Sequence, residues 1–284
     1  MSLGKDVNFE EPLQRRFKGK TVLITGAAGG VGSETARAFS KEGARLVLCD
    51  LPSTEPKLKQ LVTVLLSLGS PTVIYVCGDV TSVEDVKKSV QHGVDKLGGI
   101  DILLNSAGIA PVAPLQLTDE AMFKTVQDVN VYGTFLMMKY TSNQMIKSEK
   151  GGVIINMSSF LGMKGGDPLF AYTASKFAVS GMTRAAAKSL AKHNIRVCAI
   201  APHMLEGDLA DKVNDDLAEL MSLGSGNQNK EEVKAAVLAG GLQEVPLGHF
   251  GQMRDVAGVV LFLCSKESSY ITGVVLPVDG GATA

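Results

Sequence analysis

The sequence lacks the features that would direct a protein to nucleic acid or into a membrane. Its 284 residues carry a formal net charge of -1 and contain no basic run, so they offer a nucleic acid no electrostatic surface to bind. No stretch reaches the roughly 18 consecutive apolar residues that a membrane helix needs. The first twenty residues mix acidic and basic side chains without an apolar core, so we expect no signal peptide. These absences favour a cytoplasmic protein.

Cysteine is scarce, and its placement indicates no metal site and no disulfide. The chain has 4 cysteines, and each lies inside an apolar run rather than in a pair at metal-binding spacing: Cys49, Cys77, Cys198 and Cys264. We expect buried free thiols that act as small hydrophobic side chains in a reducing compartment.

What the sequence does contain is a repeated alternation of short apolar runs and helical segments. A chain of this length can form one large α/β domain or two small ones, and it buries a core without disulfides. Alternation of this kind predicts a seven-stranded, parallel, doubly wound sheet of the Rossmann type, flanked by helices. The expected strands are 20–25, 45–49, 72–77, 101–104, 153–157, 195–200 and 274–278, and the expected helices are 33–42, 55–68, 83–97, 118–148, 172–193 and 254–264.

The pattern becomes irregular between residues 203 and 248. Helical candidates at 209–223 and 231–238 flank a polar break at 224–230. An insertion of this length at the carboxyl edge of a sheet indicates a substrate lid. We therefore expect an N-terminal extension (1–17) and a single catalytic domain (18–284), with the lid at 203–248.

A glycine-rich loop follows the first predicted strand directly. The strand runs into Gly26-Ala27-Ala28-Gly29-Gly30-Val31-Gly32, and a helix follows. Backbone amides at a helix start, with no Cβ in the way, can approach a pyrophosphate and use the positive helix end. A glycine cluster can also be only a flexible turn.

The second predicted strand ends on Asp50, about twenty residues past this loop. An acidic residue at that position accepts hydrogen bonds from the ribose hydroxyls of the adenosine and repels a 2′-phosphate. Neither the loop nor the residues just after Asp50 carry arginine or lysine, so NAD is favoured over NADP. The alternative is a solvated turn aspartate before Pro52.

Two further strand ends carry residues suited to a cofactor. Asp79-Val80-Thr81 follows the third strand, where Thr81 or the next residue, Ser82, can equally cap the following helix. The small residues of Asn105-Ser106-Ala107-Gly108 close the fourth strand and let the chain pass close to a ring or a sugar.

Tyr172 and Lys176 lie four residues apart on a predicted helix, so they share one face. A phenol with a pKa near 10 is a poor proton shuttle at neutral pH. An ammonium about 4 Å away can lower that pKa enough to make Tyr172 a working acid or base. Ser159 lies 13 residues earlier, after the fifth strand, and strengthens this interpretation. Asn130, a polar residue in an apolar stretch, is either a helix-kinking structural residue or a functional one.

Together and in this order, these residues resemble the classical short-chain dehydrogenase/reductase family over roughly residues 18–281. The family's Thr-Gly-x-x-x-Gly-x-Gly loop is matched from Thr25 to Gly32, and its Asn-Asn-Ala-Gly segment is matched at 105–108 with one substitution. The resemblance maps a catalytic tetrad onto Asn130, Ser159, Tyr172 and Lys176. With the loop and strand ends above, it implies cofactor contacts from Gly26, Gly30, Val31, Gly32, Asp50, Asp79, Val80, Asn105, Ala107, Gly108, Tyr172, Lys176, Pro202 and Leu205.

The resemblance also implies a role for each member of the tetrad. Tyr172 exchanges a proton with the substrate oxygen while the nicotinamide gives or takes hydride, and Ser159 holds that oxygen. Lys176 binds the nicotinamide ribose and lowers the pKa of Tyr172. Asn130 holds a water that links Lys176 to solvent. By analogy, the helices that carry Asn130 and Tyr172 would form a homotetramer, with a dimer as the alternative.

The segment after the sixth strand departs from the family. The family usually has Pro-Gly there, followed by a threonine that binds the nicotinamide carboxamide; this chain has Pro202-His203 and then Gly207. We expect backbone groups of residues 202–205 to contact the carboxamide. His203 is either a substrate-binding or titrating group in the active site or a structural turn histidine.

These observations predict an NAD-dependent oxidoreductase that interconverts a secondary alcohol and a ketone. Within enzymes, an NADPH-dependent reductase of 3-oxoacyl thioesters is the alternative, which Asp50 disfavours. From other classes, a non-catalytic protein that senses NADH and a scaffold protein remain. The predicted partners are a small-molecule alcohol or ketone and further copies of the chain, with no nucleic acid and no membrane.

Overall fold

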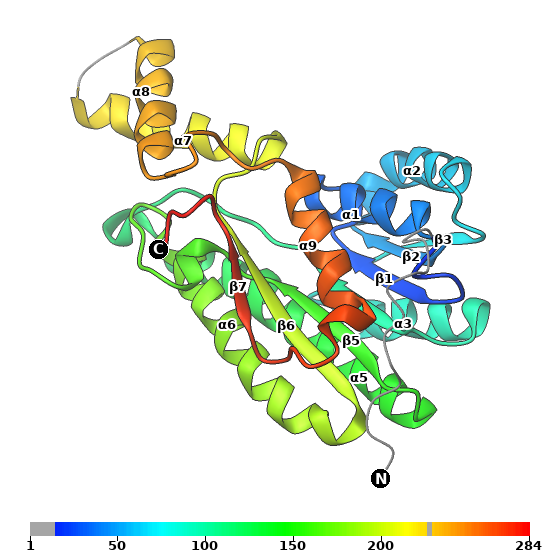
Figure 1. Ribbon diagram of the computed structural model, residues 1–284. Coiled ribbons are helices and arrows are strands. Elements are labelled where there is room, and N and C mark those ends of the chain that lie inside the picture. The colour runs from blue at the N-terminus through cyan, green and yellow to red at the C-terminus, as the bar shows by residue number, and fades with distance from the viewer. Residues whose placement is uncertain (1–14, 226–228) are drawn as a thin grey trace.

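Seven parallel strands form the sheet on which the rest of the chain is built (Figure 1). The computed structural model describes residues 15–225 and 229–284. The strands lie in the order β3-β2-β1-β4-β5-β6-β7, so the chain reverses direction across the sheet between β1 and β4 and the predicted doubly wound α/β fold is confirmed. Their bounds are β1 Thr21–Thr25, β2 Arg45–Asp50, β3 Val73–Cys77, β4 Ile102–Asn105, β5 Gly152–Met157, β6 Ile195–Pro202 and β7 Val275–Val278.

Helices cover both faces of this sheet (Figure 1). Helices α1 (Gly30–Lys41), α2 (Glu55–Ser67) and α9 (Met253–Cys264) pack on one face, and α3 (Val83–Leu97), α5 (Thr134–Ser148) and α6 (Phe170–Leu190) pack on the other. Short helical turns complete the chain: η1 Pro52–Thr54, η2 Leu115–Leu117, η4 Phe160–Gly162, η5 Ala191–His193 and η6 Lys266–Ser268.

The alternation of side chains along each strand supplies both halves of the core. In β1, Val22 and Ile24 pack under the α1 layer, whereas Leu23 packs under the α3 layer, and all three are fully buried. Successive residues of a strand point to opposite faces. A strand that is buried on both sides therefore needs a continuous apolar run, which is the pattern that predicted it.

The helix predicted over residues 118–148 is interrupted. The chain forms α4 (Glu120–Gln127), then a π-helical turn η3 (Asp128–Gly133), and then α5. Asn130 lies in the π-helical turn. A turn of this type widens the helix by one residue and is frequent at functional sites.

Two helices protrude beyond the carboxyl edge of the sheet, in the segment predicted as a lid (Figure 1). Helix α7 (Asp208–Ser225) and helix α8 (Lys230–Gln243) pack on each other. Helix α8 extends five residues past its predicted end at 238, through two glycines. Part of the predicted polar break, residues 226–228, lies outside the described residues.

The end of the predicted N-terminal extension is packed against the domain, and residues 1–14 lie outside the described residues. Phe17 is 2% exposed, and its ring meets that of Phe39 edge-on at 4.8 Å between centroids. Arg16 forms an ion pair with Glu42 at 3.0 Å.

The prediction of buried cysteines is confirmed at three of the four positions. Cys49, Cys198 and Cys264 are buried free thiols, and Cys77 is a half-buried one. The described residues contain no cluster of histidine, cysteine and acidic side chains suited to a metal ion. They also contain no helix with the length and apolarity to cross a membrane.

Candidate active site

The carboxyl edge of the sheet gathers the predicted site residues from segments that are far apart in the sequence. Parallel strands end at one edge, so the ends of β1, β2, β4, β5 and β6 bring the glycine loop, Asp50, Asn105, Ser159 and Pro202 to one side of the molecule. Helix α6 adds Tyr172 and Lys176 from its first turns.

The glycine loop is held too tightly for side chains at two positions. Gly26 has a φ of +61°, and a Cβ there would lie 2.8 Å from the Ala107 backbone. A Cβ on Gly32 would lie 2.2 Å from the Gly26 carbonyl oxygen. Glycine is therefore required at 26, where the turn meets the segment after β4, and at 32, where α1 packs on the turn itself.

The N-terminus of α1 is free to bind an anion. Its N-cap, Gly29, makes no side-chain hydrogen bond, and no acidic residue lies in the first turn of the helix as described. The first backbone amides of a helix lack intrahelical partners and form its positive end. This end fits a pyrophosphate group.

Asp50 occupies the end of β2 beside this loop. Its carboxylate accepts hydrogen bonds from the Ala28 amide and from the Leu51 amide, both at 2.8 Å. Asp50 is half-buried, and a carboxylate has about four acceptor sites. It retains acceptor capacity for the hydroxyls of a ribose.

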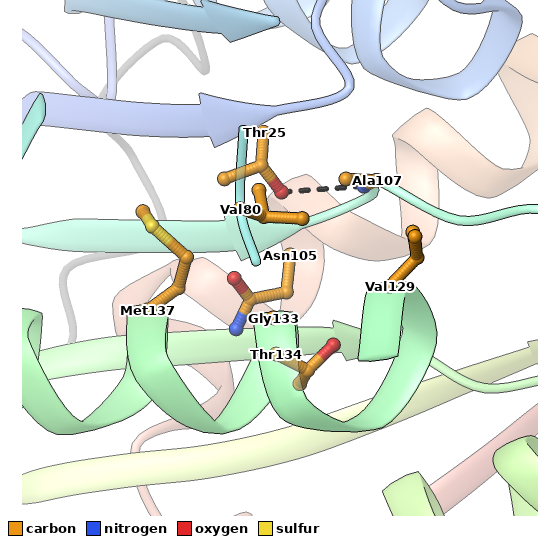
Figure 2. A pocket seen from close by; sticks show the side chains of 8 residues that line it. All are labelled: Thr25, Val80, Asn105, Ala107, Val129, Gly133, Thr134 and Met137. Atoms are coloured by element: carbon orange, nitrogen blue, oxygen red, sulfur yellow. Dashed lines mark hydrogen bonds between the residues drawn. The ribbon is translucent and has the colours of Figure 1, made fainter. Parts of the chain in front are cut away.

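A narrow pocket, too small to hold a water molecule, lies between the ends of β1 and β4 and the π-helical turn (Figure 2). Thr25 Oγ1 accepts hydrogen bonds from the Ser106 and Ala107 amides at 3.1 and 3.2 Å. The Asn105 side chain is buried, and within the described part of the chain its Oδ1 atom has no hydrogen-bond partner. Val80 also lines this pocket.

The turn after β3 also caps the next helix. Ser82 is the N-cap of α3 and accepts from the Asp85 amide at 3.2 Å. The Asp79 carboxylate accepts from the Thr81 amide at 2.8 Å. The predicted capping role therefore falls to Ser82, and Asp79 shapes the turn that presents Val80.

Ser159 and Tyr172 form the centre of the site. Ser159 is 5% exposed, and its Oγ accepts from the Leu161 amide at 3.2 Å. Burial raises the pKa of Tyr172, and a hydrogen bond with Ser159 acts in the opposite direction. The net shift is upward, whereas the sequence led us to expect a pKa lowered by Lys176.

Lys176 is buried beside the tyrosine. Its ammonium donates to the Met157 carbonyl at 2.7 Å and lies 5.3 Å from the centroid of the Tyr172 ring. The side chain is 5% exposed and forms no ion pair among the described residues. Burial alone lowers the pKa of Lys176 to about 8, because desolvation disfavours the charged form.

Asn130 joins the π-helical turn to the site. Its amide oxygen accepts from the Ile109 amide, and its Nδ2 donates to the Ile109 carbonyl, both at 2.9 Å. Nδ2 also donates to Ser175 Oγ at 3.0 Å. A Cβ on Gly108 would lie within 4 Å of both Asn130 Oδ1 and Lys176 Nζ. Asn130 therefore has a clear structural function and lies next to the lysine.

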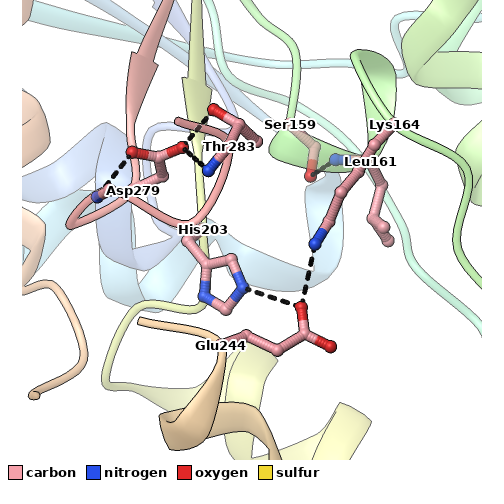
Figure 3. A network of polar contacts seen from close by, with 8 residues as sticks. Ser159, Leu161, Lys164, His203, Glu244, Asp279 and Thr283 are labelled. Atoms are coloured by element: carbon pink, nitrogen blue, oxygen red, sulfur yellow. Dashed lines mark hydrogen bonds and ion pairs between the residues drawn. The ribbon is translucent and has the colours of Figure 1, made fainter. Parts of the chain in front are cut away.

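His203 lies at the end of β6, across from the loop that follows Ser159 (Figure 3). Its ring packs on the Phe160 ring with centroids 4.0 Å apart. Its Nε2 lies 3.9 Å from a Glu244 oxygen, and that oxygen accepts from Lys164 Nζ at 3.0 Å. Burial lowers the pKa of His203 despite the nearby carboxylate of Glu244.

Sequence reasoning missed several residues of this site. Ser175, which accepts a hydrogen bond from Asn130, follows Tyr172 by three residues, a spacing that places the two on the same face of α6. The Met157 carbonyl that holds Lys176 is a backbone group and leaves no trace in the sequence. Glu244 approaches His203 from the far end of α8, and no local pattern marks it.

The sheet order and the residues at its carboxyl edge define a Rossmann-type oxidoreductase. A protein-family profile described as Enoyl-(Acyl carrier protein) reductase matches residues 26–283. The chain is 38% identical over 266 residues to galactitol 2-dehydrogenase of Agrobacterium fabrum and to 3-oxoacyl-acyl-carrier-protein reductase of Thermotoga maritima, in each case covering 94% of this chain and 98% of the relative. It belongs to the short-chain dehydrogenase/reductase family.

Relatives and solved structures agree on this assignment. The chain is 35% identical to sorbitol dehydrogenase of Cereibacter sphaeroides over 94% of its length and 98% of that protein. A solved structure of NAD+-bound xylitol dehydrogenase superposes with a TM-score of 0.86 at 34% identity, covering 93% of this chain and 99% of that chain. Levodione reductase superposes with a TM-score of 0.85 at 28% identity, covering 94% and 99%. The protein is therefore a short-chain oxidoreductase.

Proposed function

We propose that the protein is an NAD-dependent oxidoreductase that interconverts a secondary alcohol and a ketone, with Tyr172 as its acid and base. The observation that carries this proposal is the cluster in which Ser159 lies close enough to Tyr172 to oppose the rise of its pKa and the buried Lys176 ammonium lies 5.3 Å from the tyrosine ring. Polyol dehydrogenases among the relatives support an alcohol as substrate.

The side chains divide the work of proton transfer. In the direction of oxidation, Tyr172 in its phenolate form takes the hydroxyl proton of the alcohol while Ser159 holds the reacting oxygen by a hydrogen bond. Bound NAD would supply the acceptor for the hydride that leaves the carbinol carbon. With a pKa of about 8, Lys176 is mostly protonated at neutral pH, and its ammonium would donate hydrogen bonds to the nicotinamide ribose. In the direction of reduction, Tyr172 returns the proton to the ketone oxygen.

The preference for NAD follows from the end of β2. The Asp50 carboxylate lies beside the glycine loop, where it would accept from ribose hydroxyls and repel a 2′-phosphate. The free N-terminus of α1 would hold the pyrophosphate. Asp79, Val80, Asn105, Ala107 and Gly108 would line the cofactor path. Backbone groups of Pro202 to Leu205 would meet the nicotinamide carboxamide.

Substitution of Tyr172→Phe tests the mechanism. Removing the hydroxyl should lower turnover at least a thousandfold, since proton transfer and the orientation of the substrate both depend on it, while NADH binding should change by less than about fivefold. Tyr132→Phe, at an exposed position on the π-helical turn, is the matched control and should leave turnover intact. Unchanged turnover in the Tyr172 variant would defeat the mechanism. Wild-type protein that binds NADH and oxidises no alcohol would instead favour an NADH sensor, and protein that binds neither nucleotide would favour a scaffold.

Calorimetric titration with NADH and NADPH tests the role of Asp50. We expect NADH to bind about a hundredfold more tightly, a difference of about 2.8 kcal/mol. Asp50→Asn keeps an oxygen that can accept from the Ala28 amide but removes the charge, so it should narrow this difference to less than about tenfold. Tighter binding of NADPH by the wild-type protein would overturn the assignment.

A second candidate is reduction of a 3-oxoacyl thioester with NADPH. The 3-oxoacyl-acyl-carrier-protein reductase of Thermotoga maritima favours this candidate, because it shares the same 38% identity with this chain as galactitol 2-dehydrogenase does. The test is NADPH consumption with a short 3-oxoacyl thioester, compared with NADH production from a panel of secondary alcohols. Faster turnover of the thioester would place this candidate first.

We further infer a homotetramer, or a dimer, built on helices α4 to α6. Large aromatic side chains on these helices and their connecting segment are more than a third exposed: Phe123, Tyr132, Phe135, Phe170 and Phe177. A patch of this kind favours association. Light scattering after size exclusion would give the number of copies. We also infer one catalytic domain at 18–284 with a substrate lid at 203–248, acting in the cytoplasm, where free thiols such as these persist.

A further inference from the structure

His203 is a buried polar side chain whose hydrogen-bonding capacity is not used. The residue is 8% exposed, and among the described residues neither ring nitrogen has a hydrogen-bond partner. Its Nε2 is 3.9 Å from Glu244, beyond hydrogen-bond distance, and the oxygen it faces is already bound by Lys164. A buried donor or acceptor that lacks a partner is costly unless a ligand or a water completes it.

The ring lines a cavity. A space of about 240 Å³ lies between the ends of β6 and β7 and the segment after α8, and its other walls are mostly apolar or small: Met204, Val245, Leu247, Gly251, Val278 and Gly280. Two carboxylates also border it, and each accepts from backbone amides: Asp255 from Gln252, and Asp279 from Gly281 and Thr283. Their oxygens are thereby held in turns, whereas the imidazole is not held by any hydrogen bond.

The imidazole of this cavity also contacts the segment that carries Ser159. His203 follows Pro202, the last residue of β6, and its ring packs on Phe160, the residue directly after Ser159. The imidazole therefore contacts the residue next to Ser159, whose hydroxyl would hold the reacting oxygen. A substrate that reaches Ser159 and extends past Phe160 would meet this ring.

We propose that His203 is a specificity-determining residue that hydrogen-bonds a second oxygen of the substrate, a hydroxyl or carbonyl separate from the reacting one. This inference rests on the proposed alcohol–ketone activity and names its substrate class: diols and hydroxyketones with a compact apolar skeleton. The apolar walls accommodate the carbon skeleton, and the imidazole, whose two nitrogens have no hydrogen-bond partner within the described residues, binds the second oxygen. A site built to bond a hydroxyl discriminates against the analogue that lacks it, because its buried polar group is then left unpaired.

The probes are cyclohexanol and the 1,2-, 1,3- and 1,4-cyclohexanediols. They share one rigid skeleton and differ in the presence and distance of a second hydroxyl. For the wild-type protein with the nucleotide it prefers, we expect at least one diol to exceed cyclohexanol by about tenfold or more in binding, measured by calorimetry, and in kcat/KM. The difference should lie in KM rather than kcat, since the bond is present in both ground and transition states.

Two substitutions separate recognition from packing. His203→Phe keeps an aromatic ring against Phe160 and removes both nitrogens, so it should abolish the diol preference and leave the values for cyclohexanol within about threefold. His203→Asn places an amide near the position of Nδ1 and should restore part of the preference. His193→Phe changes a histidine of the η5 turn, which does not line the cavity, and should keep the preference in full.

The outcomes distinguish the inference from the activity on which it rests. A wild-type protein that shows no diol preference, or a His203→Phe variant that loses diol and cyclohexanol activity equally, overturns the role of His203. Absence of turnover with every alcohol and both nucleotides overturns the proposed activity. The calorimetric comparison of diol and cyclohexanol then still decides the role of His203, because it requires no turnover; equal binding, or none, would refute it.

Discussion

Replacement of Lys176 by methionine should make the protein more stable at neutral pH and inactive. The ammonium is 5% exposed, and burial lowers its pKa from 10.5 to about 8. Each pKa unit corresponds to about 1.4 kcal/mol, so burying this charge costs about 3 kcal/mol of folding free energy. Its hydrogen bond to the Met157 carbonyl, at 2.7 Å, offsets about 1 to 2 kcal/mol. Methionine fills similar space without a charge, and the net gain should be about 1 to 2 kcal/mol.

The lowered pKa of Lys176 determines how the stability difference between the variant and the wild-type protein changes with pH. Below pH 8 the lysine is protonated in both the folded and the unfolded state, so the full cost is present. Between the folded pKa of about 8 and the unfolded value of 10.5, only the unfolded state binds the proton, and wild-type stability rises with pH. The advantage of Lys176→Met should therefore be largest below pH 8 and should shrink toward pH 10.5.

Urea denaturation of both proteins from pH 6 to pH 10 measures this difference directly. Lys188→Met, at an exposed lysine on the same helix, is the matched control and should change stability by less than about 0.5 kcal/mol at every pH. A Lys176→Met variant less stable than wild type at pH 7, or an advantage that grows with pH, would refute the reasoning.

Three further outcomes are expected. Ser159→Ala removes the interaction that lowers the pKa of Tyr172. The rise in the rate of alcohol oxidation with pH should therefore move to higher pH, and the maximal rate should fall about a hundredfold. A pH–rate profile with its midpoint at the wild-type pH would contradict this. Asn130→Ala leaves the Ile109 amide and carbonyl without partners and should cost about 2 to 4 kcal/mol in urea denaturation; a loss below about 1 kcal/mol would contradict it. Gly32→Ala places a Cβ 2.2 Å from a carbonyl oxygen of its own loop, so calorimetry should show NADH binding weakened more than tenfold, whereas near-normal binding would show that the loop adjusts.

The sheet could be predicted from the sequence because its strands are buried on both faces. Continuous β-branched and aliphatic runs, such as residues 21–25 and 45–49, are required where helices cover both sides. The strand ends then place chemistry-bearing residues at one edge, so the gathering of Asp50, Asn105 and Ser159 follows from topology.

The interruption of the helix at 118–148 could not be predicted in the same way. The π-helical turn at 128–133 places Asn130 where it bonds to Ile109 and Ser175, in segments that are distant along the chain. These contacts span 21 and 45 positions. A single polar residue in an apolar stretch signals that some partner exists without identifying it.

The electrostatics of the site also depended on three-dimensional detail. Spacing along a helix correctly places Lys176 beside Tyr172. The expected fall in the pKa of Tyr172 was wrong for this structure, because burial outweighs the hydrogen bond from Ser159. How deeply a first-turn tyrosine is buried depends on the loop packed over it, and a sequence pattern does not report that.

The position of Asp50 constrains how this protein can change its cofactor. The carboxylate also accepts from the Ala28 amide, so the group that would select the nucleotide is part of the scaffold of the glycine loop. A single substitution to a residue without an acceptor oxygen would release that amide and loosen the loop along with the selectivity. Redesign toward a 2′-phosphorylated nucleotide therefore calls for paired substitutions, one to introduce a positive charge and one to replace the lost loop contact. An evolutionary route between the two cofactors would have to pass through a less stable intermediate or gain the compensating contact first.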